Sequence, residues 1–323
     1  MKTAFVTGVN GQDGSYLTYL LLEKGYVVYG LSRSDKKGTP HKNLNIIRGD
    51  VKDSSLIHKL IYEIKPDEVY NLAGQSNVKM SFDIPEETLS SICTGTLNLL
   101  EAIKNISPTT KFYQASSSEM YGLNTNIPEF GFSENDKFMP ASPYACCKVF
   151  AHNLVSNYRK NHGIHASGGI LFNHESPLRS DLYVTRKITK AAAKIKLGLQ
   201  EKLSLGNINS LRDWGFAGDY VEAMWLMLQQ RDPDDYVICS GETTSVKTFA
   251  QVVFDHAGLG DCMQYIECKD SLMRKNEASC VRGNPTKARN VLDWKPKCSF
   301  SQLAKIMYEN DFAILARGAI NEN

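Results

Sequence analysis

Strand-like and helix-like segments alternate through the first half of the chain. Short apolar runs rich in β-branched and aromatic residues are each followed by a longer segment in which apolar residues recur every three or four positions. Because neighbouring parallel strands need a long crossover connection, usually a helix, this order predicts a Rossmann-type, doubly wound parallel sheet. The predicted strands are 3–7, 27–31, 68–72, 111–115 and 166–171, and the predicted helices are 15–24, 56–64, 89–104 and 142–162.

The alternation stops after Phe172. Beyond it lie a basic helix-like segment at 184–197 and, after short mixed elements, a closing helix at 301–316. A helix at 220–229 and a strand at 236–239 are expected to return to the sheet. The sequence therefore predicts an α/β fold with a smaller mixed α/β lobe. The expected division is 1–171, joined by 213–240, for the sheet domain and 172–212 with 241–323 for the second lobe.

The charge balance argues against two classes of partner. The 323 residues include 37 Lys and Arg against 35 Asp and Glu, a formal net charge of +2, with no block of like charges. Such a chain has no strong field to attract nucleic acid or an anionic membrane, so neither is expected as a partner. No apolar stretch is long enough to cross a bilayer, and the first predicted strand follows Met1-Lys2 directly, which leaves no room for a signal peptide. We therefore expect a cytoplasmic location.

The eight cysteines and seven histidines are scattered along the chain. They form no Cys-x-x-Cys pair, His-Glu-x-x-His motif or finger-like arrangement. In a chain expected in the cytoplasm, we interpret the cysteines as reduced thiols, and we predict no metal site.

A glycine-rich loop with the pattern Gly-x-x-Gly-x-x-Gly joins the first predicted strand to the first predicted helix. In this context the glycines let the backbone approach a pyrophosphate, and the N-terminus of the following helix points its partial positive charge at the phosphates. A tight turn without a ligand is the less favoured alternative. The loop residues expected to bind a dinucleotide are Gly8, Asn10, Gly11, Gln12, Asp13 and Gly14.

The end of the second predicted strand indicates which dinucleotide is bound. Residues 30–34 contain no acidic side chain to hold a free ribose 2′-hydroxyl, whereas Arg33 is able to pair with a 2′-phosphate. This favours NADP over NAD, although a solvated surface arginine remains an alternative. Asp50 and Val51, after the third strand, are expected near the adenine, and Leu72 and Ala73 near the cofactor's underside.

Two further segments carry acid–base chemistry. Tyr144 and Lys148 lie four residues apart and share one face of a predicted helix. A nearby ammonium group is expected to lower the pKa of the Tyr144 phenol and make it a base for a substrate hydroxyl. The spacing alone is common by chance, but here it accompanies the glycine loop and a serine-rich strand end at 115–118.

Together these motifs resemble a known family. The glycine loop, Ser116-Ser117-Ser118-Glu119, Tyr-x-x-x-Lys and the segments 173–177, 184–188 and 210–215 resemble the GDP-mannose 4,6-dehydratase family of extended short-chain dehydrogenases. The resemblance runs from Lys2 to about Phe312. It implies conversion of a GDP-hexose into its 4-keto-6-deoxy form with tightly held NADP, which is reduced and reoxidised in each turnover. It also implies a homodimer or homotetramer.

The resemblance assigns roles to the catalytic residues. Tyr144, assisted by Lys148, takes the proton of the C4 hydroxyl as hydride leaves C4, and Ser117 hydrogen-bonds the C4 oxygen. The family usually has threonine at the position of Ser117. Glu119 removes the C5 proton and helps the C6 hydroxyl leave as water. The plainer alternative for Glu119 is a surface acid at a strand end.

The resemblance also implies contacts with the substrate. Arg212 and Arg274 match the pair that grips the pyrophosphate, a task suited to the planar guanidinium fork. We find no role for Arg282. The remaining substrate-binding positions implied are Asn173, Glu175, Val184 and Lys187.

Four residues depart from the family pattern near the expected pocket: Gly74, Glu87, Ile92 and Leu178. Relatives of this kind act on other GDP-hexoses, including GDP-N-acetylglucosamine on the route to legionaminic acid. Because Gly74 removes a methyl group from the wall beside the cofactor, we expect the acetamido sugar as substrate, with GDP-mannose as the alternative. A GDP-sugar ketoreductase that consumes NADPH and a catalytically silent nucleotide-sugar sensor also stay open.

Overall fold

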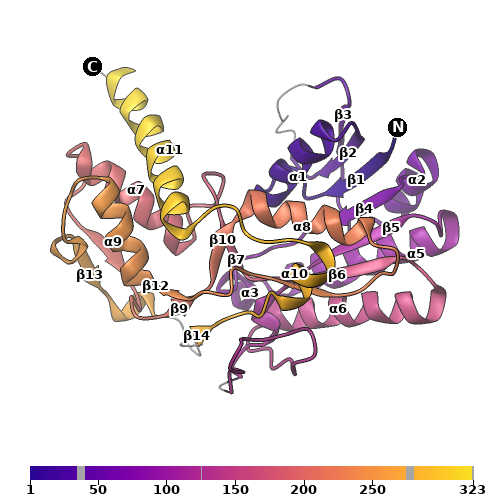
Figure 1. Ribbon diagram of the computed structural model, residues 1–323. Helices are drawn as coiled ribbons and strands as arrows, with labels where there is room; N and C mark the ends of the chain where they lie inside the picture. Colours follow the sequence, from indigo (N-terminus) through magenta and orange to yellow (C-terminus); the bar gives the residue numbers. More distant parts are fainter. Residues whose placement is uncertain (35–40, 125, 274–279, 322–323) are drawn as a thin grey trace.

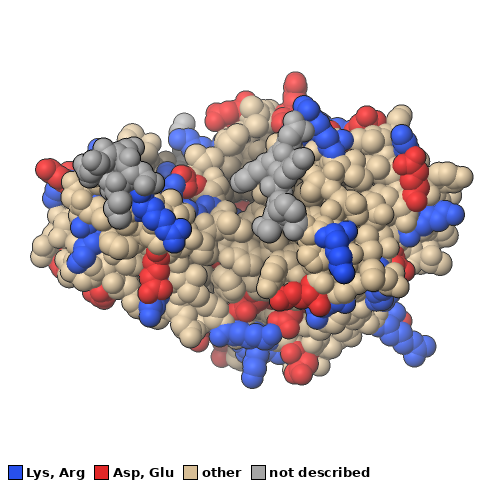
Figure 2. Space-filling view, turned by 90° about the horizontal axis from the view of Figure 1, so that it is seen from above, with Lys and Arg blue, Asp and Glu red and all other residues tan. Residues whose placement is uncertain are grey.

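The computed structural model of the protein describes residues 1–34, 41–124, 126–273 and 280–321. Two lobes lie side by side (Figure 1). The larger lobe is built on a parallel sheet, and the smaller one contains α7, α9 and the C-terminal helix α11 (Val184–Lys196, Val246–His256 and Phe300–Asn321). Basic and acidic side chains are interspersed over the face seen in Figure 2, in keeping with the absence of like-charge blocks in the sequence.

The sheet of the larger lobe has seven strands in the order β11-β6-β5-β4-β1-β2-β3, and every neighbouring pair is parallel. The prediction of a doubly wound parallel sheet is confirmed. The periodicity set no range for β3, which is the outer strand and only half buried. The strands are β1 (Thr3–Thr7), β2 (Val27–Ser32), β3 (Leu44–Arg48), β4 (Glu68–Asn71), β5 (Lys111–Ser117), β6 (Ala166–Leu171) and β11 (Tyr236–Ile238).

Helices cover both faces of this sheet (Figure 1). Alternate residues of β1 point to opposite faces, so Val6 joins the core beneath α1 and α8 while Phe5 joins the core against α2 and α5. Strand order reverses between β1 and β4, and such a switch point opens a crevice at the carboxyl ends of the strands. The covering helices are α1 (Gln12–Glu23), α8 (Ala217–Gln229), α2 (Ser54–Ile64), α5 (Gly95–Ile106) and α6 (Pro143–His162).

Helix α6 begins and ends at clear signals. The Ser142 hydroxyl accepts a hydrogen bond from the amide of Ala145 at 3.1 Å, and Pro143 occupies the first helical position. Gly163 ends the helix with φ of 65°, a left-handed conformation that glycine adopts without strain. These caps place Tyr144 and Lys148 in the first turns of α6, next to the end of β5.

The predicted single helix at 89–104 is divided in the structure. It consists of α4 (Pro85–Leu89), a π-helical turn (Ser90–Thr94) and α5. At the junction Gly95 lies so close to Val51 that a β-carbon would come within 2.7 Å of its Cγ2. The π turn places Ile92 in the interior, where its exposed fraction is 1%.

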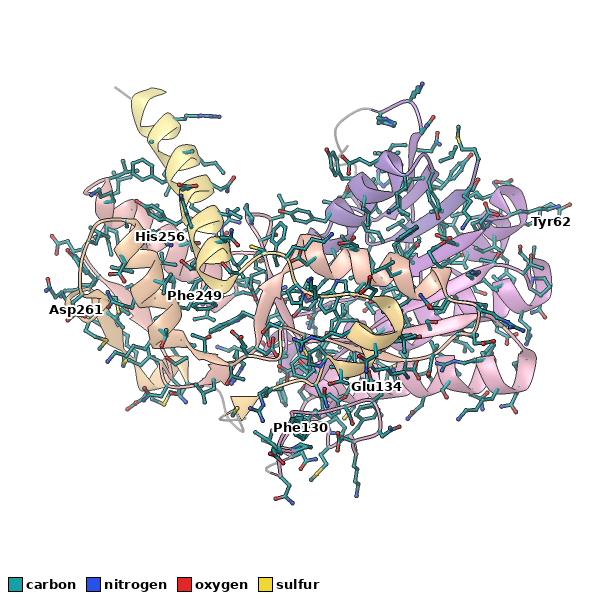
Figure 3. The ribbon with its side chains drawn as sticks, in the orientation of Figure 1. Tyr62, Phe130, Glu134, Phe249, His256 and Asp261 are labelled. Carbon is teal, nitrogen blue, oxygen red and sulfur yellow. The ribbon has the colours of Figure 1, made fainter. Side chains whose placement is uncertain are left out.

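The smaller lobe has its own core. Aromatic and aliphatic side chains from α7, α9 and α11 pack around Phe249, labelled in Figure 3. Its short strands pair as β10 with β7, β9 with both β12 and β14, and β13 with β8. The short elements are α3 (Met80–Asp83), β7 (Asn173–Glu175), β8 (Leu203–Leu205), β9 (Leu211–Arg212), β10 (Trp214–Phe216), β12 (Thr244–Ser245), β13 (Ile266–Cys268) and β14 (Cys280–Val281), with 3-10 turns at Ser118–Met120, Cys262–Gln264 and Asp270–Leu272.

One part of the expected second lobe packs elsewhere. Helix α10 (Thr286–Leu292) and Trp294 fall within 241–323, yet both contribute to the core of the larger lobe. Trp294 is 2% exposed, donates from Nε1 to the carbonyl of Asp219 at 2.9 Å and meets the Tyr220 ring edge to face. A large aromatic ring gains most where a deep core is available, and the sheet lobe provides it.

Two further observations concern the whole described chain. None of its helices has the length and apolar character needed to cross a bilayer. All eight cysteines lie within the described residues, and each is a free thiol.

Candidate active site at the switch point of the sheet

A cavity of about 550 Å³ opens at the carboxyl ends of β1, β4 and β5. This is the crevice expected where strand order reverses. Every residue predicted to bind the cofactor or to act in catalysis lines it. Across the described residues, no group of three or more His, Cys, Asp or Glu side chains is placed to hold a metal ion.

The glycine loop is tightly folded against its neighbours. Gly8 has φ of +69°, and a β-carbon there would lie 2.9 Å from the carbonyl oxygen of Leu72. A β-carbon on Gly14 would lie 2.3 Å from the carbonyl oxygen of Gly8. Helix α1 begins at Gln12 with its N-terminus at the cavity, so the loop presents backbone rather than side chains to this space. This arrangement fits the pyrophosphate of a dinucleotide.

A buried ion pair between Asp13 and His174 fixes the glycine loop to the neighbouring cavity wall. His174 lies with Nε2 2.8 Å from a carboxylate oxygen of Asp13 and Nδ1 2.7 Å from the carbonyl oxygen of Phe172. Because both ring nitrogens face acceptors, both carry protons and His174 is an imidazolium cation. Burial acts to lower the pKa of His174, but the charge of Asp13 and the hydrogen bond to it together outweigh burial, and the pKa is raised. Burial likewise acts to raise the pKa of Asp13, and His174 lowers it.

The end of β2 has an acidic neighbour that the strand sequence does not reveal. Arg33 Nη1 lies 2.7 Å from Oε1 of Glu87, which reaches over from α4. Oε2 of Glu87 lies 2.6 Å from Lys52 Nζ. Residues 30–34 contain no acidic side chain, and this carboxylate comes from a distant segment of the chain. The adenine-side residue Asp50 accepts a hydrogen bond from the amide of Lys52 at 3.0 Å.

The turn after β4 is held by a single hydroxyl. The amides of Leu72 and Ala73 both donate to Oγ1 of Thr7 at 3.1 Å. Thr7 in turn donates to Asn71 Oδ1 at 2.8 Å. These bonds fix the turn at the cavity floor, and Val51 lies beside it with its carbonyl bonded to Asn98.

Tyr144 and Lys148 lie close to Ser117, but the pKa of Tyr144 differs from the prediction. Burial raises the pKa of Tyr144 above its usual value, and a hydrogen bond with Ser117 acts in the opposite direction. Lys148 Nζ donates to the carbonyl of Ala115 at 2.6 Å and lies 5.6 Å from the centre of the Tyr144 ring. Burial lowers the pKa of Lys148 to about 8. The expected lowering of the Tyr144 pKa by Lys148 is therefore wrong, because burial dominates.

Glu119 sits in the short 3-10 turn that follows β5. Its amide donates to Ser117 Oγ at 3.2 Å, and its half-buried side chain lines the cavity. The Glu119 charge contributes to the raised pKa of Tyr144, so the two groups are close enough to interact. This placement differs from that of a surface acid at a strand end.

The predicted substrate residues are divided between two places. Asn173 lines the cavity. Glu175 is buried, accepts a hydrogen bond from Thr185 at 2.6 Å and lies 3.0 Å from Nε of Arg179. Its carboxylate is thus turned toward protein groups and away from the cavity. Val184 and Lys187 lie on the first turn of α7, outside the cavity wall.

The two arginines expected to grip the pyrophosphate are not seen together. Arg212 lies on β9 in the smaller lobe, where its Nη1 donates to the carbonyl of Leu211 at 2.8 Å. Arg274 lies outside the described residues. Arg282, for which we found no role, donates to the carbonyl of Glu129 and so ties β14 to the loop before α6.

Arg179 and Tyr183 are among the cavity residues that the sequence motifs did not identify. Arg179 stacks on the ring of Tyr183, with its guanidinium carbon 3.5 Å from the ring centre, and both side chains line the cavity. Tyr183 is also hydrogen-bonded to Ser76 at 2.9 Å. The available signal was the position of Arg179 two residues beyond the segment 173–177, which the sequence analysis singled out.

Comparison with known proteins identifies the family. A family model described as GDP-mannose 4,6 dehydratase matches residues 5–307. The chain belongs to the GDP-mannose 4,6-dehydratase family. Arabidopsis thaliana GDP-mannose 4,6 dehydratase 1 is 48% identical to it, over 98% of this chain and 91% of the relative. The human GDP-mannose 4,6 dehydratase is 41% identical, over 97% and 92% respectively.

Solved structures confirm the fold that this family shares. RMD from Pseudomonas aeruginosa, solved with NADPH, has a TM-score of 0.81 at 26% identity and covers 97% of this chain and 100% of its own. The Thermotoga maritima UDP-glucose 4-epimerase reaches a TM-score of 0.86 at 22% identity, over 97% and 99%. The resemblance drawn from the sequence motifs is thereby confirmed.

Two of the four departures from the GDP-mannose 4,6-dehydratase pattern, Gly74 and Ile92, compensate one another. Gly74 has φ of +146°, and a β-carbon there would lie 3.0 Å from Cγ1 of Ile92. Ile92 therefore occupies the space that the smaller residue leaves, and the expected widening of the pocket at Gly74 is wrong. Glu87 faces Arg33 at the ribose end, and Leu178 is 53% exposed.

Proposed function

We propose that this chain is a GDP-hexose 4,6-dehydratase that works with a bound nicotinamide dinucleotide. The observation that carries the proposal is the convergence of Tyr144, Ser117 and Glu119 on the cavity that the glycine loop borders. A simple dehydrogenase needs the first two of these groups and has no use for the carboxylate. The names of the relatives support the same activity.

The cofactor would be held by the chain's own backbone and a few side chains. Gly8, Gly11 and the N-terminus of α1 suit a pyrophosphate, and Lys148 suits the nicotinamide ribose. Arg33 is the proposed contact for a 2′-phosphate, which makes NADP the preferred form. When bound, the nicotinamide supplies hydride chemistry by accepting hydride from C4 and returning it to C6.

Tyr144 removes the proton from the C4 hydroxyl in the proposed reaction. Ser117 hydrogen-bonds the phenol and is placed to share the C4 oxygen, which orients the hydroxyl toward Tyr144. Arg179 also favours the phenolate form through its positive charge. Burial opposes ionisation, so Tyr144 depends on these partners to act as a base.

In the proposed reaction, Glu119 acts in the step that eliminates water from C5 and C6. The C4 ketone acidifies the proton on C5, and the Glu119 carboxylate takes that proton as the bond between C5 and C6 gains double-bond character. Glu119 passes this proton to the C6 hydroxyl, which leaves as water, and the proton held by Tyr144 then returns to C5. The half-buried position of Glu119 beside Ser117 and Tyr144 supports the proposal that Glu119 and Tyr144 act on the same sugar ring.

Among GDP-hexoses, we propose GDP-mannose as the substrate. The relatives are named for this sugar, and Ile92 fills the space at Gly74 on which the acetamido prediction depended. The proposed pyrophosphate contacts remain Arg212 and Arg274. In the proposed site, Glu175 positions Arg179 rather than touching substrate.

We further propose a homo-oligomer. Leu97 on α5 and Phe150 on the adjacent helix α6 are 37% and 49% exposed, and pairing with a second copy would bury such side chains. Light scattering of the purified protein tests this. A cytoplasmic location and the absence of nucleic-acid and membrane partners stay predictions from the sequence.

The decisive experiment incubates the protein with GDP-mannose and GDP-N-acetylglucosamine in parallel and follows loss of water by mass spectrometry. We expect dehydration of GDP-mannose with no net consumption of NADPH. Reaction of the acetamido sugar alone would overturn the choice of hexose. Consumption of one NADPH per product would indicate a ketoreductase, and absence of any reaction with either sugar would favour a sensor.

A further inference from the structure

Glu87 bridges two cations at the ribose end of the cavity. One carboxylate oxygen lies 2.7 Å from Arg33 Nη1, and the other lies 2.6 Å from Lys52 Nζ. Lys52 also lies 3.5 Å from a carboxylate oxygen of Asp50. Arg33 and Asp50 line the cavity, so Glu87 acts on this site from behind its wall.

The backbone around Glu87 holds its position. Its carbonyl accepts a hydrogen bond from the Ser91 hydroxyl at 2.7 Å. On the same short helix, Thr88 is fully buried and bonds to the carbonyl of Ile84 at 2.9 Å. The Glu87 side chain is 32% exposed and that of Arg33 is 65% exposed. The Glu87 carboxylate, held by two cations, thus faces the guanidinium of Arg33, most of which is open to solvent.

The same corner holds polar groups suited to a ribose. Asn10 donates to the hydroxyl of Ser32 at 2.7 Å, and both line the cavity beside Arg33. A 2′-phosphate bound here would need a cation. Arg33, which directly follows β2, is already paired with the carboxylate of Glu87. A ribose with a free 2′-hydroxyl has no need of that cation.

We propose that Glu87 sets the cofactor preference of this chain by competing with the 2′-phosphate of NADP for Arg33. This inference rests on the proposed function, since it requires a nicotinamide dinucleotide in the cavity. When NADP binds, Arg33 must pair with both the Glu87 carboxylate and the 2′-phosphate, and the two anions come close together. Their repulsion lowers the affinity for NADP. Binding of NAD leaves the pair between Glu87 and Arg33 intact. The preference of this chain for NADP over NAD is accordingly smaller than it would be if Arg33 had no carboxylate beside it.

The test measures dissociation constants for NADPH and NADH by fluorescence titration of the full-length protein and of Glu87→Gln. Glutamine keeps the shape and an acceptor oxygen but removes the charge. We expect NADPH to bind about tenfold more tightly, as when a charge-assisted pair is released to a new anion. We expect the affinity for NADH to change by less than about twofold, as is usual for an exposed charge.

Two variants control this measurement. Glu86→Gln removes the same charge from the neighbouring, exposed position of α4 and is expected to leave both affinities unchanged. Arg33→Ala combined with Glu87→Gln is expected to lose the gain in NADPH affinity. Glu87→Tyr gives a second neutral variant of different shape, with the same expected gain.

Three outcomes overturn the inference: no gain for NADPH, an equal change for both cofactors, or the same gain in Glu86→Gln. These results are distinguishable from failure of the proposed function. A protein that binds both cofactors and dehydrates a GDP-hexose, but whose preference ignores Glu87, contradicts only this inference. A protein that binds neither cofactor contradicts both.

Discussion

The two ends of the cavity differ in how far solvent reaches their charges. At the catalytic end Tyr144 is 7% and Lys148 8% exposed, whereas at the ribose end the Arg33 side chain is 65% exposed. Burial dominates at the first end and brings the pKa of Lys148 down to about 8. At the second end water screens the ion pairs and keeps each of them weak. The catalytic end therefore tolerates little change, while single substitutions are able to adjust the ribose end.

The largest expected effect comes from Tyr144→Phe at the buried end. It removes only the phenolic oxygen, and turnover should fall by roughly a thousandfold or more because the proton acceptor is lost. Cofactor affinity should stay nearly unchanged. Steady-state rates and NADPH titration check both points, with Tyr158→Phe on the same helix as control. A rate near that of the wild type would show that Tyr144 is not the base.

Glu119→Gln separates the two halves of the reaction. Hydride should still leave C4, but elimination should slow by roughly a hundredfold or more because the proton acceptor for C5 is lost. Reduced nicotinamide should then accumulate to about one equivalent per site, seen as absorbance near 340 nm in stopped flow. Unimpaired dehydration, or slow dehydration without this transient, would remove Glu119 from its proposed step.

His174→Gln tests the buried ion pair that joins the glycine loop to the catalytic end. The folded-state pKa of His174 is raised above 6.5, so its contribution to stability is complete below pH 6.5 and is lost as the pH rises through the raised value. The folded-state pKa of Asp13 is lowered below 3.8, so its contribution is complete above pH 3.8 and is lost in stronger acid. The pair is thus fully effective between these two values.

Urea unfolding of the wild type and His174→Gln should differ by about 3 kcal/mol at a pH inside that window, because Asp13 is left as an uncompensated buried charge. The difference should shrink in strongly alkaline buffer, where the wild-type imidazole loses its proton. His41→Gln, at an exposed position, controls for the loss of a histidine. A difference that is independent of pH would mean that packing, rather than charge, holds this contact.

Arg33→Ala at the exposed end should have the smallest effect. NADP binding should weaken by roughly tenfold and NAD binding by less than about twofold, because only NADP presents a second anion to the guanidinium. Raising the salt concentration should narrow the gap between the cofactors. Equal weakening of both would show that Arg33 does not contact the 2′-phosphate, and the contrast between the two ends would then need another explanation.

The sequence was most informative where chemistry follows local spacing. Alternating periodicity identified β1, β2, β4, β5 and β6, and the four-residue interval between Tyr144 and Lys148 placed both on one helix, which the structure brings beside Ser117. It was least informative where partners come from distant segments. Nothing in residues 30–34 predicts the contact with Glu87. Glu87 lies 54 positions beyond Arg33, and only the folded chain brings the two side chains together.

Burial was the other quantity that spacing does not supply. The interval between Tyr144 and Lys148 suggested a lowered phenol pKa, but the depth of both side chains reverses the sign. Glu175 shows the same limit: a motif marked it as a contact for substrate, whereas its carboxylate is enclosed by Thr185 and Arg179.

The path of the chain between the lobes has a consequence for synthesis on the ribosome. The sheet receives its outer strand β11 only after α7 of the smaller lobe has been made, and its core is closed by Trp294, close to the C-terminus. Tyr113 of β5 belongs to that same core, so the strand that leads to Ser117 is enclosed only after Trp294 has emerged. The core of the larger lobe is therefore unable to close before α7 and α9 of the smaller lobe have been synthesised, and a nascent chain halted before Trp294 carries an open hydrophobic face.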